Sequence, residues 1–324
     1  MRIVKNMVIG LAILLLLIVI GGYAYLHLAF PRAQAPAEIT IELSPERVAR
    51  GEYLTAHVLG CMDCHSERQH QFFSAPPKPE SYGKGGELVH DAPGKVPASN
   101  ITPAALKDWT DGEIIRAITE GVSRDGRPLV PMMPYIEYRY LSTEDVKAVV
   151  AYLRTLKPIE NNVALPEVNF PLNLIFRTLP GPAAPMPDPP EDDLISRGEY
   201  LVQVAGCAFC HSPVEKGQPI KGMRLAGGHA FGLGKDLTLY SANLTPDLET
   251  GIGNWSEEMF LGRFQVYRDS AMQIIPVTDE RPQTVMPWVM YAGIKDEDLR
   301  AIYAYLKSLK PIRHKVEKYR LVKE

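Results

Sequence analysis

All four cysteines of the chain lie in two motifs that share one spacing. The first is Cys61-Met62-Asp63-Cys64-His65 and the second is Cys207-Ala208-Phe209-Cys210-His211. In a C-x-x-C-H motif, each thiol can form a thioether with a vinyl group of a porphyrin, while the adjacent histidine ligates the iron. The spacing therefore predicts two covalently bound haem c groups, attached through Cys61, Cys64, Cys207 and Cys210 and ligated by His65 and His211.

Three other sites use closely spaced cysteines: a thioredoxin-like redox pair, a zinc site and a structural disulfide in an exported protein. None of them requires a histidine directly after the second cysteine. A redox pair also follows a strand, whereas a short helix is expected before each motif here. A four-cysteine zinc site would not explain why the surrounding sequence occurs twice. Haem attachment is therefore favoured for both motifs.

The chain contains an internal duplication. Arg50-Gly51-Glu52-Tyr53-Leu54 returns as Arg197-Gly198-Glu199-Tyr200-Leu201, shortly before each cysteine motif. The same order continues in both halves, pairing Ser99–Pro103 with Ala242–Pro246, Trp109 with Trp255, Met133-Pro134 with Met286-Pro287, Tyr138 with Tyr291, and Val149–Ile159 with Ile302–Ile312. We expect two domains of similar size, residues 44–160 and 191–313, followed by a tail at residues 314–324.

The strongest local patterns are helical. Apolar residues recur at helical spacing in Val146, Val149, Val150 and Leu153, and again in Leu299, Ile302, Tyr303 and Leu306. Ser44-Pro45 is typical of a helix start, and Thr110-x-x-Glu113 has the form of a capping box. Residues 75–98 and 216–236 are rich in Gly and Pro without sustained alternation, so few strands are expected. The predicted fold class is mainly α, with long loops.

A proline-rich stretch separates the two copies. Residues 161–190 hold eight prolines between Pro166 and Pro190. Proline disfavours both a helix interior and a central strand. We therefore expect an extended linker over residues 161–190.

The N-terminal segment is apolar enough for a membrane helix. Met7 to Phe30 contains no Asp, Glu, Lys or Arg and is long enough to cross a bilayer. Arg2 and Lys5 precede it, which places the N-terminus in the cytoplasm and the rest of the chain in the periplasm. The alternative is a cleaved signal peptide, with Ala33-Gln34-Ala35 as its cleavage site, although its apolar core would be unusually long. We expect residues 1–30 to be a single-pass anchor in the bacterial inner membrane.

Composition and charge exclude some functions. The 324 residues carry a formal net charge of -3, which offers no basic field for nucleic acid. Asp and Glu residues form no repeated pair suited to acid and base catalysis, and no phosphate-binding glycine loop occurs.

The repeated motifs resemble the dihaem cytochrome c family, in particular the cytochrome subunits and partners of bacterial membrane dehydrogenases. The resemblance covers residues 44–313 and implies two tandem class I type cytochrome c domains. It also implies that Met133 and Met286 are the distal iron ligands. Thioether sulfur is a soft, uncharged donor that favours reduced iron, so ligation by His and Met raises the reduction potential and suits electron transfer.

Other side chains compete for the distal position. Met132 is the nearest rival in the first half, and Met272 and Met290 are the rivals in the second. His57, His70, His90 and His229 have no histidine counterpart in the other repeat, so surface or supporting positions are expected for them.

Several further residues are expected near the cofactor. Asn100, Thr102, Asn243 and Thr245 are predicted to hydrogen-bond near the haem propionates, and Trp109 and Trp255 to form pocket walls. Helix capping and core packing are equally good explanations for these six residues.

Two filled haem sites favour an electron carrier over an enzyme. The expected partners are a dehydrogenase subunit, a quinol-oxidising complex or a terminal oxidase. The first alternative is a haem enzyme with one open iron, such as a dihaem peroxidase or a thiosulfate-oxidising cytochrome. A peroxidase needs one iron that can open, whereas both halves here retain Met-Pro. A thiosulfate-oxidising enzyme with a cysteine ligand would need a fifth cysteine. The other alternative is a subunit whose main task is to dock a catalytic subunit to the membrane.

Overall fold

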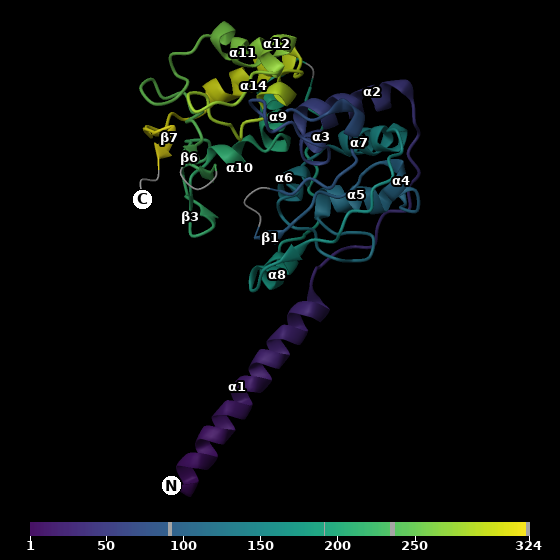
Figure 1. Ribbon diagram of the computed structural model, residues 1–324, viewed down its shortest axis with the longest axis vertical. Coiled ribbons are helices and arrows are strands. Elements are labelled where there is room, and N and C mark those ends of the chain that lie inside the picture. The colour runs from purple at the N-terminus through teal and green to yellow at the C-terminus, as the bar shows by residue number, and fades with distance from the viewer. Residues whose placement is uncertain (90–92, 191, 234–236, 322–324) are drawn as a thin grey trace.

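The computed structural model describes residues 1–89, 93–190, 192–233 and 237–321. The predicted mainly helical fold is confirmed, and so is the apolar helix at the N-terminus. Helix α1 (Arg2–Ala29) stands clear of the folded part of the chain (Figure 1). None of its residues is buried, and its length and composition would allow it to cross a membrane.

The two repeats use corresponding elements. The first contains α2 (Pro45–Tyr53), η1 (Leu54–Val58), α3 (Cys61–Cys64), η2 (Pro79–Ser81), α4 (Pro103–Leu106), α5 (Asp111–Glu120), α6 (Tyr135–Tyr138) and α7 (Thr143–Thr155). The second contains α9 (Leu194–Val204), α10 (Cys207–His211), α11 (Glu257–Gln265), η4 (Val266–Arg268), α12 (Ser270–Gln273), α13 (Trp288–Tyr291) and α14 (Asp296–Ser308). Their buried side chains join in one continuous hydrophobic cluster, while the exact domain boundaries stay a prediction.

The strands are short. Within the described residues they form three small antiparallel sheets: β1 (Gly94–Lys95) with β2 (Glu167–Val168), β3 (Val214–Glu215) with β4 (Gln218–Pro219), and β5 (Ala230–Gly232) with β6 (Leu237–Tyr240) and β7 (Tyr319–Leu321). Strands β1, β4 and β5 lie within the predicted loop regions 75–98 and 216–236, β3 and β6 border the second region, and β2 and β7 lie elsewhere in the chain.

The predicted helix starts are confirmed. The Ser44 side chain accepts a hydrogen bond from the Arg47 amide, and Thr110 and Glu113 form both bonds of a capping box. The apolar stripe of α7 is buried, as is that of α14 except for the partly buried Tyr303.

In each repeat, a close contact between the first and last helices explains why a glycine occurs at the equivalent position. Helix α2 packs on α7, and α9 packs on α14. A Cβ atom on Gly51 would lie 1.9 Å from the Ala148 carbonyl oxygen, and one on Gly198 would lie 1.9 Å from that of Ala301. Only glycine permits the backbones to approach this closely.

The repeats differ by one residue in the helix before the cysteines. Arg50 to Cys61 is one residue longer than Arg197 to Cys207. In the second repeat α9 is α-helical throughout, whereas in the first the chain changes from α2 to the π-helical turn η1. A π-turn accommodates a single inserted residue without breaking the helix.

The repeats are joined by two equivalent buried clusters. Asp145 accepts two hydrogen bonds of 2.8 Å from Arg50 of its own repeat and one of 2.6 Å from the Tyr200 hydroxyl of the other repeat. Asp298 likewise accepts from Arg197 at 2.6 Å and from the Tyr53 hydroxyl. The two aspartates are only 5% and 1% exposed. Each repeat therefore completes the hydrogen bonding of the other.

The tyrosine hydroxyls also serve the helix starts. The Ser142 amide, before α7, donates to the Tyr200 hydroxyl at 3.2 Å, and the Lys295 amide, before α14, donates to that of Tyr53 at 3.3 Å. Burial and then the neighbouring aspartate raise the pKa of both tyrosines, so the hydroxyls stay neutral donors.

The expectation that residues 161–190 are extended throughout is wrong in one part. Strand β2 pairs with β1, and helix α8 (Leu172–Ile175) and the turn η3 (Phe176–Thr178) follow it. The helical turns fall in the proline-free run 172–179, directly after Pro171. The rule against proline inside a helix therefore holds. The many prolines around residues 172–179 kept α8 and η3 from being predicted.

Removing one tyrosine hydroxyl of this pair of clusters should weaken the whole fold. Tyr53→Phe leaves buried Asp298 without one donor, so the free energy of unfolding should fall by about 1–3 kcal/mol. Denaturation of the detergent-solubilised protein would measure this, with Tyr319→Phe on exposed β7 as the control. Combining Tyr53→Phe with Asp298→Asn should cost less than the sum of the two changes, and strict additivity would contradict the contact.

Candidate functional site

Each cysteine motif forms a short helix that starts at a left-handed glycine. Gly60 (φ 73°) precedes α3 and Gly206 (φ 66°) precedes α10. The two cysteines of a motif are three residues apart on one turn, which puts both thiols on the same side. All four thiols are free. Burial raises the pKa of Cys61 and Cys207 to about 12, so these are neutral thiols and lack the lowered pKa of a dithiol oxidoreductase.

Both motif histidines are oriented in the same way. The Nδ1 atom of His65 lies 2.6 Å from the Ser99 carbonyl oxygen, and that of His211 lies 2.8 Å from the Ala242 carbonyl oxygen. A carbonyl accepts only a proton donor, so Nδ1 carries the proton and Nε2 keeps its lone pair. Burial lowers the pKa of both rings, which favours the neutral form that can ligate iron. The residues present thus fit a haem iron.

The repeated Asn and Thr residues hold the segment that orients each histidine. Asn100 Oδ1 accepts from the amide and the hydroxyl of Thr102, at 2.9 and 2.8 Å, and its Nδ2 donates to the Ile159 carbonyl oxygen at 2.8 Å. Asn243 makes the same three bonds to Thr245 and Ile312. These bonds tie the carbonyl-bearing loop to the end of the repeat. Contact of Asn100, Thr102, Asn243 and Thr245 with haem propionates stays a prediction.

A repeated tyrosine fixes the backbone just before each motif. The Tyr138 hydroxyl donates to the Leu59 carbonyl oxygen, and the Tyr291 hydroxyl donates to that of Ala205 at 3.1 Å. Both acceptors lie two residues before the first cysteine of a motif. The sequence predicted no role for these tyrosines, although their equivalence under the repeat was a signal that they have one.

The two sites meet across the junction between the repeats. Gly60 lies against α13 of the second repeat, where an added Cβ would sit 3.3 Å from Met290 Sδ. Gly206 faces α6 of the first repeat, where a Cβ would sit 3.7 Å from Glu137 Cγ. Met290 and Glu137 occupy equivalent positions, so the contacts are reciprocal. Each attachment helix thus begins against the helix that follows the other repeat's Met-Pro.

Polar contacts repeat this exchange. His57, in the π-turn η1, places Nδ1 3.0 Å from the Met290 carbonyl oxygen. In the other direction, Gln203 Nε2 donates to Glu137. His57 and Gln203 both lie four residues before the first cysteine of their motif, so these two contacts come from equivalent positions.

The predicted methionine ligands occupy equivalent turns. Met133 and Met286 are partly buried, pack against the common core and lie two residues before the short helices α6 and α13. Met286 receives extra support, because the Ser74 hydroxyl of the first repeat donates to its carbonyl oxygen at 3.2 Å. Ser74 also donates its amide to Gln283 at 2.7 Å. Ser74 and Gln283 could not be found from the sequence, because neither belongs to a repeated pair.

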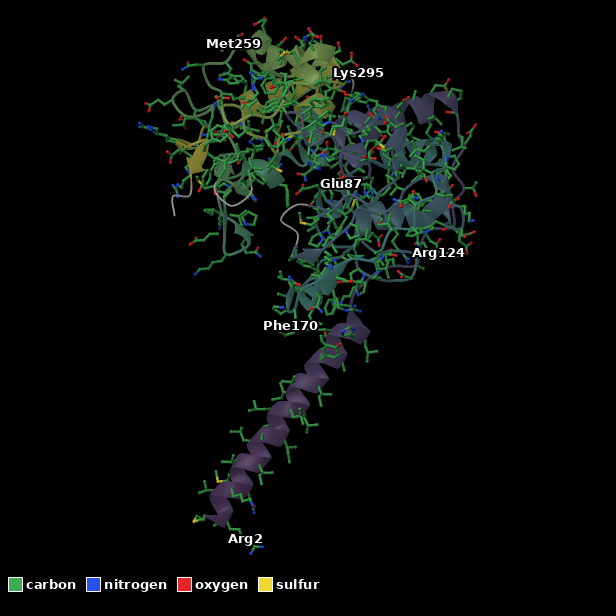
Figure 2. The ribbon with its side chains drawn as sticks, in the orientation of Figure 1. Arg2, Glu87, Arg124, Phe170, Met259 and Lys295 are labelled. Atoms are coloured by element: carbon green, nitrogen blue, oxygen red, sulfur yellow. The ribbon has the colours of Figure 1, made fainter. Side chains whose placement is uncertain are left out.

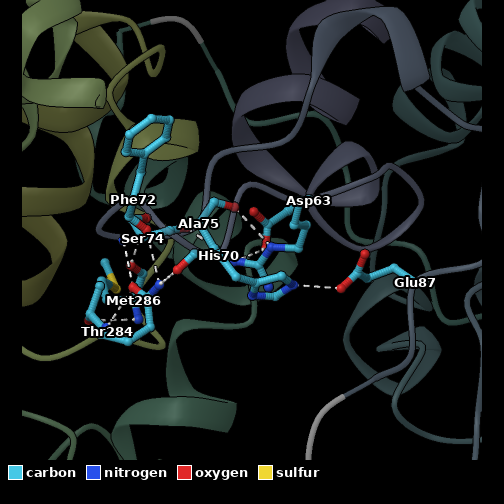
Figure 3. Close-up of polar contacts among 10 residues, drawn as sticks. Asp63, His70, Phe72, Ser74, Ala75, Glu87, Thr284 and Met286 are labelled. Carbon is cyan, nitrogen blue, oxygen red and sulfur yellow. Dashed lines mark hydrogen bonds and ion pairs between the residues drawn. The ribbon is translucent and has the colours of Figure 1, made fainter. Parts of the chain in front are cut away.

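A chain of contacts connects the first cysteine motif with the methionine turn of the second repeat (Figure 3). Asp63 lies between Cys61 and Cys64 and forms an ion pair of 3.5 Å with Arg68. Arg68 donates to the carbonyl oxygens of Ala75 and Ser74, at 3.0 and 3.1 Å. Ser74 then reaches the turn at Met286. The loop after the first motif therefore bridges both candidate sites.

The predicted pocket tryptophans and the remaining histidines make contacts of several kinds. Trp109 and Trp255 are partly buried against the core, and their carbonyl oxygens accept from Arg154 and Tyr303. His70 contacts Glu87, His229 packs against Phe231 with 4.6 Å between the ring centres, and His90 lies outside the described residues. Among the residues that the structure describes, no three His, Cys, Asp or Glu side chains gather as a metal site.

Comparison with known proteins agrees with this geometry. Residues 195–310 match the family model described as cytochrome c. The chain is 29% identical over 328 residues to a protein named "Diheme cytochrome c-type" from Cereibacter sphaeroides, covering 95% of this chain and 99% of that protein.

Two further relatives are named as subunits of dehydrogenases. The gluconate 2-dehydrogenase cytochrome c subunit of Pantoea cypripedii is 30% identical over 279 residues, and the cytochrome c subunit of the quinone alcohol dehydrogenase of Gluconobacter oxydans is 28% identical over 281. Each alignment covers 81% of this chain but only 59% and 54% of the relative, so the chain spans little more than half of their length. With its repeated C-x-x-C-H geometry, the chain is similar to cytochrome c over residues 195–310, and its relatives include a dihaem cytochrome and cytochrome c subunits of dehydrogenases.

Proposed function

We propose that the chain binds two haem c groups and transfers single electrons. The repeated contact of the motif histidine with a loop carbonyl carries this proposal, because it leaves Nε2 free in both repeats. The proposed thioether positions are Cys61, Cys64, Cys207 and Cys210, and the proposed ligand pairs are His65 with Met133 and His211 with Met286.

Bound haem c supplies a one-electron couple of its iron. The protein would contribute a neutral imidazole held by a backbone carbonyl and a thioether from the turn before α6 or α13. A soft, uncharged sulfur donor favours reduced iron and raises the reduction potential. Donors on both faces would leave no open position for a substrate.

The junction supports transfer between the two sites within one chain. Leu59 and Ala205, the carbonyls held by Tyr138 and Tyr291, directly precede the glycines that contact the other repeat. The start of each attachment helix is therefore fixed relative to the other.

The relatives indicate the kind of partner. Several are named as cytochrome subunits of dehydrogenases, so we propose a membrane dehydrogenase as electron donor. A quinol-oxidising complex is the other proposed donor, and a terminal oxidase is the proposed acceptor. Helix α1 would anchor the chain in the bacterial inner membrane, with Arg2 and Lys5 on the cytoplasmic side and both repeats in the periplasm.

Removing one pair of cysteines should remove one haem. In Cys207→Ala/Cys210→Ala the second site loses both thioethers, so covalently bound haem per chain should fall by half, as measured from the pyridine complex of the denatured protein. The matched variant Cys61→Ala/Cys64→Ala should lose the other half. An unchanged haem content in either variant would refute that attachment site.

Removing one methionine should change one centre only. Met286→Ala should keep both haems attached but lower the reduction potential of one by on the order of 0.1 V, within the range of about 0.8 V that axial ligands span. Spectroelectrochemical titration would measure both potentials, with Met272→Ala as the control. If both potentials and the spectrum stay as in the parent protein, Met286 is not the ligand.

A further inference from the structure

The end of α1 is tied to the short helical piece inside the proline-rich segment. The Arg177 guanidinium donates to the carbonyl oxygens of Leu26 (3.2 Å), His27 (3.2 Å) and Phe30 (2.9 Å). The last carbonyls of a helix have no partner within it and need one from elsewhere. Arg177 supplies it and holds η3 beside the end of α1.

The other end of this piece is tied to the first repeat. Strand β2 pairs with β1, and the Asn169 amide donates to the Pro93 carbonyl oxygen at 2.9 Å. A Cβ atom on Gly94 would lie 2.0 Å from the Glu167 carbonyl oxygen, so the two strands are in close contact. Residues 169–178 are therefore held at both ends and form a fixed part of the surface, named here the collar segment.

Large apolar side chains of the collar segment point away from the protein. Phe170 is 78% exposed and Ile175 is 49% exposed. Figure 2 shows Phe170 at the lower end of the folded part, next to the end of α1. An exposed phenylalanine and isoleucine on a rigid segment indicate a surface that is covered by something apolar.

The residues at the end of α1 resemble those of a membrane interface. Tyr23 and Tyr25 are exposed there, and Tyr25 packs edge-on against Phe30 at 5.9 Å. The Arg32 guanidinium lies 5.0 Å from the centre of the Phe30 ring. Aromatic rings and arginines gather where a membrane helix leaves the hydrocarbon and meets the lipid headgroups.

We propose that the collar segment lies in the outer interface of the same bilayer that α1 crosses. Phe170 and Ile175 would enter the boundary between headgroups and acyl chains, and Arg177 and Arg32 would lie at headgroup level. The occupant is a phospholipid bilayer, because the apolar surface continues directly from the end of α1. This inference rests on the proposed membrane-spanning role of α1, and it gives the first repeat a fixed orientation to the membrane.

Photocrosslinking of the full-length holoprotein tests this contact. Phe170 is replaced with p-benzoylphenylalanine, and the protein is illuminated in nanodiscs of phosphatidylethanolamine and phosphatidylglycerol. Met259, 56% exposed and far from α1 in Figure 2, takes the same replacement as the aqueous control. Leu15, in the middle of α1, takes it as the membrane control.

Position 170 should yield phospholipid adducts by mass spectrometry, at several times the yield of position 259 and comparable to position 15. A yield at position 170 no higher than at position 259 would overturn the inference, as would adducts only to protein. If position 15 also gave no lipid adduct, the proposed anchor itself would have failed. If position 15 reacted and position 170 did not, only the collar segment would be wrong.

Discussion

The relation between the two repeats depends on two buried carboxylates. Asp145 and Asp298 each accept hydrogen bonds from an arginine of their own repeat and from a tyrosine hydroxyl of the other repeat. A buried carboxylate that loses one of its hydrogen-bond donors is destabilised, because the donor had replaced part of its hydration. Separating the repeats would remove one donor from both carboxylates at once. The aspartates also lie in the first turns of α7 and α14, where the helix dipole favours a negative charge.

The helices that hold the two tyrosines also lead to the cysteine motifs of the candidate cofactor sites. Tyr53 ends α2, which continues through η1 to the first cysteine motif, and Tyr200 lies in α9, which leads to the second. The tyrosine that bonds to the other repeat's aspartate therefore also fixes the helix that leads to its own repeat's cysteine motif. Further contacts at Met290 and Glu137 extend the junction to the helices after the proposed methionine ligands. A change at the junction would thus act on both sites together.

Much of this could be predicted from local patterns. Three features depend only on residues that are close in the sequence. They are the repeated pentapeptide around Tyr53 and Tyr200, the apolar stripes of α7 and α14, and the capping residues. The pairing of Tyr53 with Asp298 could not be predicted, since periodicity shows which face is buried but not which repeat covers it. The π-turn had a signal in the one-residue difference between the repeats. The propionate contact expected of Asn100 stays a prediction. Its hydrogen bonds to Thr102 and to the distant Ile159 could not be predicted, because a single sequence does not show which segments meet. Helix α8 was hidden because the prolines around it dominate the composition of residues 161–190.

We propose that the chain carries two haems whose irons are both closed to added ligands. The positions of Met133 and Met286 in equivalent turns agree with the repeat, whereas iron ligation by them remains a proposal. The most direct test is the optical spectrum of the purified, dithionite-reduced protein before and after addition of carbon monoxide, with haem quantified as its pyridine complex. We predict two covalent haems per chain and no spectral change. A change that corresponds to one haem would show an accessible iron and contradict the claim, in favour of a haem enzyme.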